Sequence, residues 1–351
     1  MIIPLLKCPQ ISTDLINKYL SISNSQRKYS NFGFCEKELR KRFSKILEFP
    51  FEKITLGSSA TLLLNICCNL FSEEIKNKNG NFYFPAFSFF STFSIASSLN
   101  NKIIFYDIKN EIFLPDNLTQ INENDLLFLN VPFGSSKKLE SMLEYARNLP
   151  CRVIIDAAAC LPGIIYKNIK FNNFPSNLIL VLSLHATKLI SSGEGGACLF
   201  GSKIPNHIRQ LTNFGIIEGR RQRWTNSTNA KMSEFNAAAG LSSLDMAEFN
   251  IRKISSAKKR VIELCNNNGL NLFDDGCDPT LTLNIWSDNN KSLIDKLTKN
   301  NYEYRRWWSL VNNLENRKFK NSFKYYESII GIPFDWEGID LYFEKMCKEI
   351  S

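Results

Sequence analysis

The sequence predicts an α/β fold with two parts: a large domain with a mostly parallel central sheet flanked by helices, and a smaller C-terminal α+β domain. Two observations support this prediction. Short apolar runs alternate with helical segments through the first two thirds of the chain, as is typical of parallel sheets with helices on both faces. Near residue 250 this alternation gives way to a charged helix and a few shorter elements. We therefore expect the large domain over residues 1–249 and the small domain over 250–351.

The elements of the large domain follow in order along the chain. Residues 36–49 and 61–77 have helical periodicity, and the alanine-rich segment 233–249 is the clearest helix. The other apolar runs indicate short buried strands. One ends at Pro85, and the others span 102–108, 126–133, 152–158, 177–184 and 197–200. Ligands of such a sheet bind on the loops beyond the carboxyl ends of the strands.

The small domain is predicted to begin with a charged helix over residues 251–269. A strand at 280–287, a helix at 290–299, a strand at 328–334 and a final helix at 338–350 follow. No internal repeat or low-complexity linker separates the two parts, so we expect them to pack closely.

Composition and charge narrow the class of protein. With 44% hydrophobic and 22% charged residues among 351, the chain has the composition of a soluble globular protein. The start lacks a signal-peptide pattern, and no window reaches the roughly 18 apolar residues of a membrane helix, so we expect a cytoplasmic protein without membrane contact. The formal charge of +9 suits an anionic partner. Because the lysines are spread over the whole chain, we expect a phosphate-bearing small molecule and no nucleic acid.

The cysteines and histidines argue against a metal site. The ten cysteines form no C-x-x-C pair, and His185 and His207 are the two histidines of the chain. The scattered cysteine positions give no disulfide pattern either. We expect reduced thiols that are mostly buried.

Two loop stretches indicate a site for a phosphate and a flat ring. GSSATLLL at 57–64 opens an apolar helix with small residues, and the free N–H groups at a helix start can bind phosphate. An ordinary serine N-cap is the alternative. PAFSFF at 85–90 places aromatic residues on a loop, where one can stack on a ring or simply belong to the core.

Two further stretches carry the reactive groups. VIIDAAAC at 153–160 ends a buried strand with Asp156, a carboxylate that needs a partner because an isolated buried charge is costly. SLHATKLISSGEGGACLF at 183–200 places Lys188 between an apolar run and a glycine-rich turn, where a lysine either points to solvent or enters a pocket.

Together the four stretches have the parts of a pyridoxal phosphate site. The helix start at 59–61 would hold the phosphate, while an aromatic side chain and the alanines after Asp156 would cover the two ring faces. Asp156 would pair with the protonated ring nitrogen, and Lys188 would bind the cofactor covalently. Lys188 follows Asp156 by 32 residues, about one strand–helix–strand step.

These motifs resemble those of the DegT/DnrJ/EryC1/StrS sugar aminotransferases, which have the fold type I architecture of pyridoxal phosphate enzymes. The resemblance covers most of the chain and is closest between about residues 55 and 245. The stretches that carry it are SLHATKLISSGEGGA (the family's lysine motif), SAT at 59–61 (its phosphate loop), PAFSF, DAA at 156–158, and the helix start TNAKMSEFNAAAGL.

The resemblance implies roles for the matching residues. Lys188 would be the covalent anchor and proton shuttle, and Asp156 the partner of the ring nitrogen. Phe89 would stack on the ring, and Asn229 would reach the phosphate in the site of a neighbouring subunit, so we expect a homodimer with shared sites. The remaining implied cofactor contacts are Ser59, Ala60, Thr61, Ala158 and Ser183.

The chain also departs from the family pattern. Ala159 stands where many relatives carry Gln or His in contact with the ring hydroxyl of the cofactor. Ser88 replaces the usual Thr, Lys231 the usual Arg, and Ser227 an expected Gly. None of these changes removes Lys188 or Asp156.

The resemblance implies transfer of an amino group, usually from L-glutamate, to a ketone of a nucleotide-linked deoxysugar. His185 favours C4 of a 4-keto-6-deoxyhexose, because relatives that act at C3 commonly carry tyrosine at this position. A dTDP-sugar is favoured over UDP- and GDP-sugars, in deoxyaminosugar or surface-polysaccharide (lipopolysaccharide O-antigen) biosynthesis. Tyr29 and Asn31 in KYSNFG, and Trp307 in YRRWW, are further candidate substrate contacts, with ordinary packing as the equal alternative for Trp307 and Trp308.

Other functions remain open at this point. A C3 aminotransferase is the nearest alternative. A sugar dehydratase of the same family would carry histidine in place of Lys188, and a catalytically silent protein would be expected to lose Lys188 or Asp156 first. An amino-acid transaminase would need an arginine for the second carboxylate of its substrate.

Overall fold

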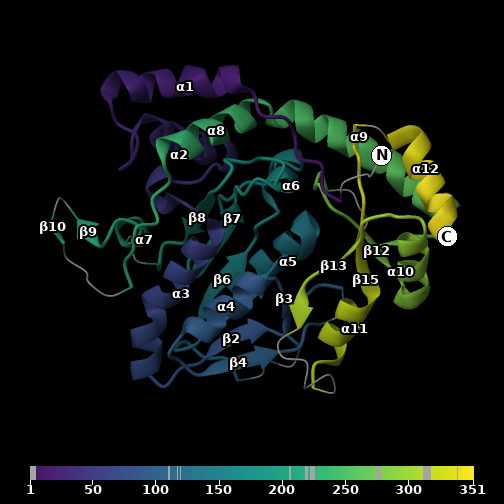
Figure 1. Cartoon of the computed structure of the whole chain (residues 1–351). Coiled ribbons are helices and arrows are strands. Elements are labelled where there is room, and N and C mark those ends of the chain that lie inside the picture. Colours follow the sequence, from purple (N-terminus) through teal and green to yellow (C-terminus); the bar gives the residue numbers. More distant parts are fainter. Residues whose placement is uncertain are drawn as a thin grey trace.

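The computed structural model describes residues 5–109, 111–116, 118, 120–204, 207–217, 220–221, 226–273, 278–310, 318–337 and 339–351. A seven-stranded sheet forms its centre (Figure 1). The strand order is β1–β8–β7–β6–β5–β2–β4. Its strands are β1 (Ile54–Gly57), β2 (Phe82–Pro85), β4 (Ile103–Tyr106), β5 (Leu126–Asn130), β6 (Arg152–Asp156), β7 (Leu178–Ser183) and β8 (Gly196–Phe200). This architecture confirms the predicted α/β fold with a mostly parallel sheet.

The direction of each strand follows from its connection. Strands β4, β2, β5, β6 and β7 are parallel to their neighbours in this series, and helices α5 (Ser136–Arg147) and α6 (Leu161–Tyr166) carry the chain from β5 to β6 and from β6 to β7. Such crossovers are what parallel pairing requires. Between β7 and β8 there is only a loop, residues 184–195, and β8 runs antiparallel to β7 and to β1. Lys188 lies in this loop, hereafter the lysine loop.

Both faces of the sheet are buried, which explains why its strands are continuous apolar runs. Ile155 faces one core cluster, and its neighbour Ile154 faces the other. Helices α3 (Ala60–Asn77), α4 (Phe90–Ser98) and α7 (Ile208–Leu211) contribute to the cluster around Ile154. Helices α2 (Phe34–Leu47), α5 and α6 contribute to the other.

Two helical regions differ from the sequence prediction. The predicted helix over 233–249 divides at Met246 into α8 (Glu234–Asp245) and α9 (Ala247–Asn267), and α9 includes most of the predicted segment 251–269. The unpredicted helix α1 (Thr13–Gln26) packs on α8 (Figure 1). None of the helices in the described part of the chain is long and apolar enough to cross a membrane.

A second, four-stranded sheet is antiparallel throughout and has the order β11–β12–β15–β13. Its strands are β11 (Asn271–Leu272), β12 (Leu283–Trp286), β13 (Arg305–Arg306) and β15 (Ile329–Ile332), and its helices after α9 are α10 (Asn290–Lys299), α11 (Lys320–Ser328) and α12 (Ile339–Ile350). The boundary between residues 249 and 250 falls in the first turn of α9 and stays a prediction.

Several contacts connect the C-terminal part of the chain with the region around the large sheet. Strand β14 (Ser309–Leu310) pairs with β3 (Phe87–Ser88), which directly precedes Phe89. The Asp107 carboxylate, just after β4, accepts hydrogen bonds from the N–H groups of Asn321 (2.9 Å) and Ser322 (2.8 Å) at the start of α11. These contacts hold residues 305–308 over the carboxyl ends of the large sheet. The remaining short elements are β9 (Ile216–Ile217), β10 (Arg220–Arg221) and the 3₁₀ turns Phe51–Lys53 and Pro132–Gly134.

Candidate active site

A cavity of about 360 Å³ lies beyond the carboxyl ends of β5, β6 and β7. Parts of the chain that are far apart in sequence line it: the ends of these strands, the start of α3, the lysine loop and the small domain. The predicted site residues that line it are Ser59, Ala60, Thr61, Phe89, Asp156, Ala158, Ser183, His185, Lys188 and Trp307.

Asp156 is the last residue of β6 and is buried, with 7% of its surface exposed. The Ala158 N–H donates a hydrogen bond to its Oδ1 at 3.0 Å. Burial raises the pKa of Asp156 to about 6, although the Ala158 N–H and the nearby Lys188 both act to lower it. A cationic group in the cavity would therefore find a carboxylate whose charge is poorly compensated by the protein.

Lys188 is held by the backbone of the lysine loop. Its N–H donates to His185 O at 2.8 Å, and the Ala186 N–H donates to Gly193 O at 2.7 Å across the loop. Burial lowers the pKa of Lys188, while Asp156 and Cys160 act in the opposite direction. Lys188 is therefore a neutral amine in a larger fraction of the molecules than an exposed lysine would be, and the neutral amine is the form that acts as nucleophile and base.

The start of α3 faces the cavity. Ser59 is the N-cap, and its Oγ accepts a hydrogen bond from Leu62 N–H at 3.2 Å, as the capping alternative supposes. The N–H groups of Ala60 and Thr61 have no partner within the helix because they belong to its first turn. A Cβ on Gly196 would lie 2.7 Å from the Cα and N atoms of Ala60, so glycine in β8 allows the helix start to approach the sheet this closely.

The side walls of the cavity are apolar or small. Phe89 is 49% exposed and stands at the N-cap of α4, directly after β3. Ala158 follows the end of β6, and Ser183 ends β7, where its Oγ accepts a hydrogen bond from His185 N–H at 3.2 Å. Phe89 and Ala158 thus offer the two apolar surfaces that a flat ring needs.

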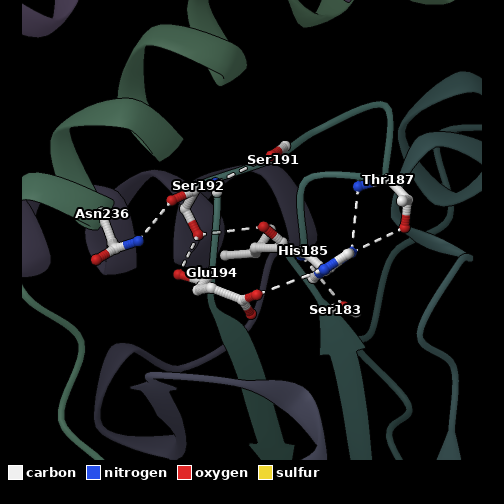
Figure 2. Close-up of polar contacts among 9 residues, drawn as sticks. Ser183, His185, Thr187, Ser191, Ser192, Glu194 and Asn236 are labelled. Carbon is white, nitrogen blue, oxygen red and sulfur yellow. Dashed lines mark hydrogen bonds and ion pairs between the residues drawn. The ribbon is translucent and has the colours of Figure 1, made fainter. Parts of the chain in front are cut away.

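His185 lies between Thr187 and Glu194 in the lysine loop (Figure 2). The Thr187 N–H donates to His185 Nδ1 at 3.2 Å, and the Thr187 hydroxyl lies 2.9 Å from the same nitrogen. Nδ1 is therefore the acceptor, and Nε2 carries the proton and faces Glu194 Oε1 at 3.4 Å. The ring is fixed in one orientation at the cavity wall.

Helix α8 supports the lysine loop from behind. Asn236 Nδ2 donates to Ser192 O at 2.8 Å, and the Ser192 hydroxyl donates to Glu194 O at 3.0 Å (Figure 2). Ser243 of the same helix accepts a hydrogen bond from Ser191 N–H at 3.0 Å. These contacts connect the alanine-rich motif of α8 to the position of Lys188.

Residues 305–308, next to strand β14, supply another wall of the cavity. Trp307 is 9% exposed, and its Nε1 has no hydrogen-bond partner among the described residues. The guanidinium of Arg305 lies 5.1 Å from the centre of the Trp307 ring, and Trp308 also lines the cavity. Trp307 thus packs in the domain and borders the cavity at once.

Tyr29, Asn31 and Asn229 do not line the cavity of their own chain. Asn229 is exposed, and its Oδ1 accepts a hydrogen bond from Lys231 Nζ at 2.7 Å. Tyr29 stacks on the exposed Phe235 at the start of α8, with 5.7 Å between the ring centres. The structure therefore places all three residues outside the cavity: Tyr29 lies against the start of α8, and Asn31 and Asn229 are exposed.

Buried Glu234 explains why the loop with Tyr29 lies against α8. Its carboxylate accepts hydrogen bonds from the N–H groups of Cys35 (2.7 Å) and Glu36 (3.1 Å) in the first turn of α2. Its own N–H donates to Tyr29 O at 3.0 Å. The acidic residue of the M-S-E motif thus caps a different helix, a role that the motif alone does not reveal.

Sequence reasoning missed several residues of the cavity: Asn130, Thr187, Glu194, Arg305 and Leu6. Glu194 was part of a quoted motif, but its contact with His185 depends on how the loop folds back. Asn130 ends a buried strand just as Asp156 does, and that shared position is the signal that could have identified it. Arg305 and Leu6 reach the cavity only through tertiary packing.

The residues present fit pyridoxal phosphate. The first turn of α3 offers free N–H groups to a phosphate, and the close approach allowed by Gly196 places them at the cavity. Phe89 and Ala158 suit the ring faces, and the desolvated carboxylate of Asp156 suits the ring nitrogen. Lys188 supplies an amine of lowered pKa in the same cavity.

Comparisons with known proteins agree with this assignment. The chain is 27% identical over 241 residues to the dTDP-4-amino-4,6-dideoxy-D-glucose transaminase of Shigella dysenteriae, an alignment that covers 67% of this chain and 62% of that protein. It is 27% identical over 213 residues to the UDP-4-amino-4,6-dideoxy-N-acetyl-beta-L-altrosamine transaminase of Helicobacter pylori (strain ATCC 700392 / 26695), covering 58% and 55%. The chain thus spans somewhat over half the length of these relatives.

Solved structures share the fold. Helicobacter pylori PseC, an aminotransferase involved in the biosynthesis of pseudoaminic acid, superposes with a TM-score of 0.79 at 20% identity and covers 100% of this chain and 98% of its own. DesI, solved in the presence of its TDP-sugar product, gives a TM-score of 0.76 at 18% identity, with 99% and 92% covered. The model of the DegT/DnrJ/EryC1/StrS aminotransferase family matches residues 10–279. This match confirms the resemblance of the sequence motifs: the chain belongs to the DegT/DnrJ/EryC1/StrS aminotransferase family.

Proposed function

We propose that the chain is a pyridoxal phosphate-dependent aminotransferase that moves an amino group from L-glutamate to C4 of a nucleotide-linked 4-keto-6-deoxyhexose. One observation carries the proposal: Lys188 and Asp156 line the same cavity, beside a helix start that can hold a phosphate. Pyridoxal phosphate is the cofactor expected of this family and of structures with this fold.

The bound cofactor supplies an electron sink for the carbanion that forms when an amino acid loses its Cα proton. The N–H groups of Ala60 and Thr61 would hold its phosphate, together with the hydroxyls of Thr61 and Ser183. Asp156 would keep the ring nitrogen protonated through a charge-assisted hydrogen bond. Phe89 and Ala158 would exclude water from the ring faces.

Lys188 would anchor the cofactor and also act as the base. With its Nζ free, Lys188 would take the proton from the donor's Cα and return it later in the half-reaction. Burial favours the neutral amine that this role needs, because it lowers the pKa of Lys188. The keto sugar enters after the donor's keto acid has left, so the kinetics are ping-pong.

The substrate class rests on His185, on Arg305 and on the names of the relatives. His185 stands in the position that favours C4 chemistry, and its orientation is fixed by Thr187 and Glu194. Arg305 at the cavity wall provides a positive charge suited to a nucleotide diphosphate. The two relatives are named for dTDP- and UDP-linked 4-amino-4,6-dideoxysugars, which supports a nucleotide-linked sugar as the acceptor. We favour dTDP and a role in surface-polysaccharide or deoxyaminosugar synthesis, with a C3 aminotransferase as the second candidate.

The first test is spectroscopic. The purified chain should bind pyridoxal phosphate with a visible absorbance band, and added L-glutamate should bleach this band as 2-oxoglutarate appears. After reduction with borohydride, the cofactor should remain on the peptide that contains Lys188. Lys188→Ala should show neither the band nor turnover, whereas Lys137→Ala, at an exposed lysine of α5, should behave as wild type.

The second test identifies the acceptor. With L-glutamate as donor, dTDP-, UDP- and GDP-4-keto-6-deoxyhexoses should be compared, and the position of the new amine determined by NMR. Amination of the dTDP-sugar at C4 is the expected result. An amine at C3, or a preference for another nucleotide, would replace that part of the proposal, and turnover by Lys188→Ala would refute the mechanism.

A further inference from the structure

Asn130 lies beside Asp156 at the edge of the sheet where the cavity opens. It is the last residue of β5, and the strand register pairs it with Asp156, the last residue of β6. Phe128 and Ile154, two positions earlier in these strands, belong to the same core cluster. Because side chains alternate along a strand, Asn130 and Asp156 point to the same face of the sheet, and both line the cavity.

The amide of Asn130 lacks a partner for its donor. The residue is only 4% exposed, and its Nδ2 makes no hydrogen bond to any described residue. A buried donor without a partner is costly, so native proteins keep such groups rarely and often for a ligand. The amide borders the cavity, so a ligand there is within its reach.

Ala159 lies nearby and has no polar side chain. It borders the same cavity three residues after Asp156, and its methyl group cannot donate a hydrogen bond. The turn that follows Asn130 packs directly on it, since a Cβ on Gly134 would lie 2.5 Å from Ala159 O. The chain therefore lacks a side-chain donor at residue 159 and has an unused donor on the adjoining strand.

We propose that Asn130 Nδ2 donates a hydrogen bond to the ring hydroxyl oxygen of pyridoxal phosphate, the contact that Ala159 cannot make. Neighbouring strands lie about 4.8 Å apart, so side chains from β5 and β6 can reach two polar atoms of one aromatic ring. Asp156 then serves the ring nitrogen and Asn130 the ring oxygen. This inference rests on the proposed function, because it requires the cofactor to occupy the cavity.

The hydrogen bond has a measurable electrostatic consequence. A hydrogen-bond donor stabilises the negative charge of the ring oxygen. The ring oxygen then has a lower affinity for the proton that lies between it and the nitrogen of Lys188. Loss of the donor should raise the pH at which the visible band of the bound cofactor shifts. A hydrogen bond to a charged group corresponds to a shift of about one to two pH units.

The experiment is a pH titration of the visible spectrum of the loaded full-length protein. Asn130→Leu keeps a similar volume without a donor and should raise the midpoint by about one to two pH units. Asn130→Ala also removes the donor and should raise the midpoint by a similar amount. Asn290→Leu is the matched control: Asn290 is also buried with an amide that lacks a described partner, but it lies in α10 outside the cavity. Its midpoint should equal that of wild type.

The outcomes separate this inference from the proposed function. A wild-type protein without a visible band refutes the cofactor assignment itself. A wild-type band whose midpoint is unchanged in both Asn130 variants leaves the aminotransferase assignment standing and overturns the role of Asn130. Equal shifts in Asn290→Leu and Asn130→Leu would also overturn it, because the effect would then be general.

Discussion

At the residue scale, the site depends on two groups that burial pushes toward neutrality. Burial raises the pKa of Asp156 to about 6 and lowers that of Lys188. Each partly offsets the penalty of the other, since opposite charges favour the ionised forms. The protein thus carries a carboxylate that is costly to ionise until a cation enters the cavity, and this cost is part of what makes the site selective for a protonated ring.

Asp156→Asn should separate function from stability. The pKa of Asp156 rises from 3.8 to about 6 on folding, so the cofactor-free protein loses stability as pH increases through this range. The variant removes this loss and should be more stable than wild type at pH 8 by about 2–3 kcal/mol, with no difference below about pH 4. Denaturant unfolding of the cofactor-free proteins at several pH values measures this difference.

The same variant should lose nearly all turnover, because a neutral amide cannot keep the ring nitrogen protonated. Asp295→Asn, at an exposed position of α10, serves as the control and should follow the wild-type stability profile. If the free energies of unfolding of wild type and Asp156→Asn changed with pH in the same way, Asp156 would not be desolvated in solution.

The sequence predicted those site residues whose role follows from local position. Asp156 ends a buried strand, and Lys188 stands in a glycine-rich loop, so chain order alone indicated their chemistry. Asn130 was missed because asparagine after a strand is usually a turn residue, and only the pairing of β5 with β6 places it beside Asp156. Glu234 was known as part of a motif, but its partners Cys35 and Glu36 lie some two hundred residues away.

At the element scale, the contact between β8 and the start of α3 positions the phosphate site. Gly196 lies where the sheet backbone meets the first turn of α3, and an added Cβ would lie 2.7 Å from the backbone of Ala60. Backbone on both sides cannot move aside as a flexible side chain can. The geometry of the N–H groups of α3 therefore depends on glycine in a neighbouring strand.

Gly196→Ala should weaken cofactor binding by at least about tenfold and destabilise the fold by about 1–3 kcal/mol, as expected for overpacking. Titration with pyridoxal phosphate, followed by the visible band, measures the affinity. Gly80→Ala is the control, because its Cβ would also meet backbone, at Asn124 O, but outside the cavity, so it should destabilise the fold without changing the affinity for the cofactor. Equal affinities for Gly196→Ala and wild type would show that the helix start does not hold the phosphate.

The buried strands of the central sheet could be predicted from the sequence better than the helices on the outside of the molecule. Strands β5, β6 and β7 are apolar on both faces, so the run itself marks them. Helix α1 has Tyr19 and Ser23 as its buried residues, and its pattern is too polar to identify a helix. The division at Met246 was missed because Leu244, Met246 and Ala247 all favour helix, so the local sequence carries no stop signal there.

At the scale of the whole molecule, the site requires both sheets. Pairing of β14 with β3 places Trp307 and Arg305 opposite Asp156, although some two hundred residues separate the two strands. The N-terminal segment also packs on the small domain, where Trp336 Nε1 donates to Lys7 O at 2.7 Å. Such non-local contacts leave no periodic trace in the sequence, so the role of YRRWW could only be suggested from composition.

The outer surface around the start of α8 suits a second copy of the chain. Phe235 is 55% exposed and Tyr29 41% exposed, and the two rings stack on each other. Asn229, whose implied role lies in a neighbouring site, is also exposed and does not line the cavity of its own chain. We therefore infer a two-fold dimer in which Asn229 completes the partner's phosphate site.

Mixing two inactive variants tests this arrangement. Asn229→Asp places a negative charge beside the partner's phosphate, and Lys188→Ala removes the anchor from its own chain. In a mixed dimer both lesions fall in one site and the other site is intact, so an equal mixture after subunit exchange should regain roughly a quarter of wild-type turnover. A mixture of Lys188→Ala with Asp156→Asn is the control and should stay inactive, since each site takes both residues from one chain. If exchange is demonstrated and the first mixture stays as inactive as the second, Asn229 serves its own subunit or none.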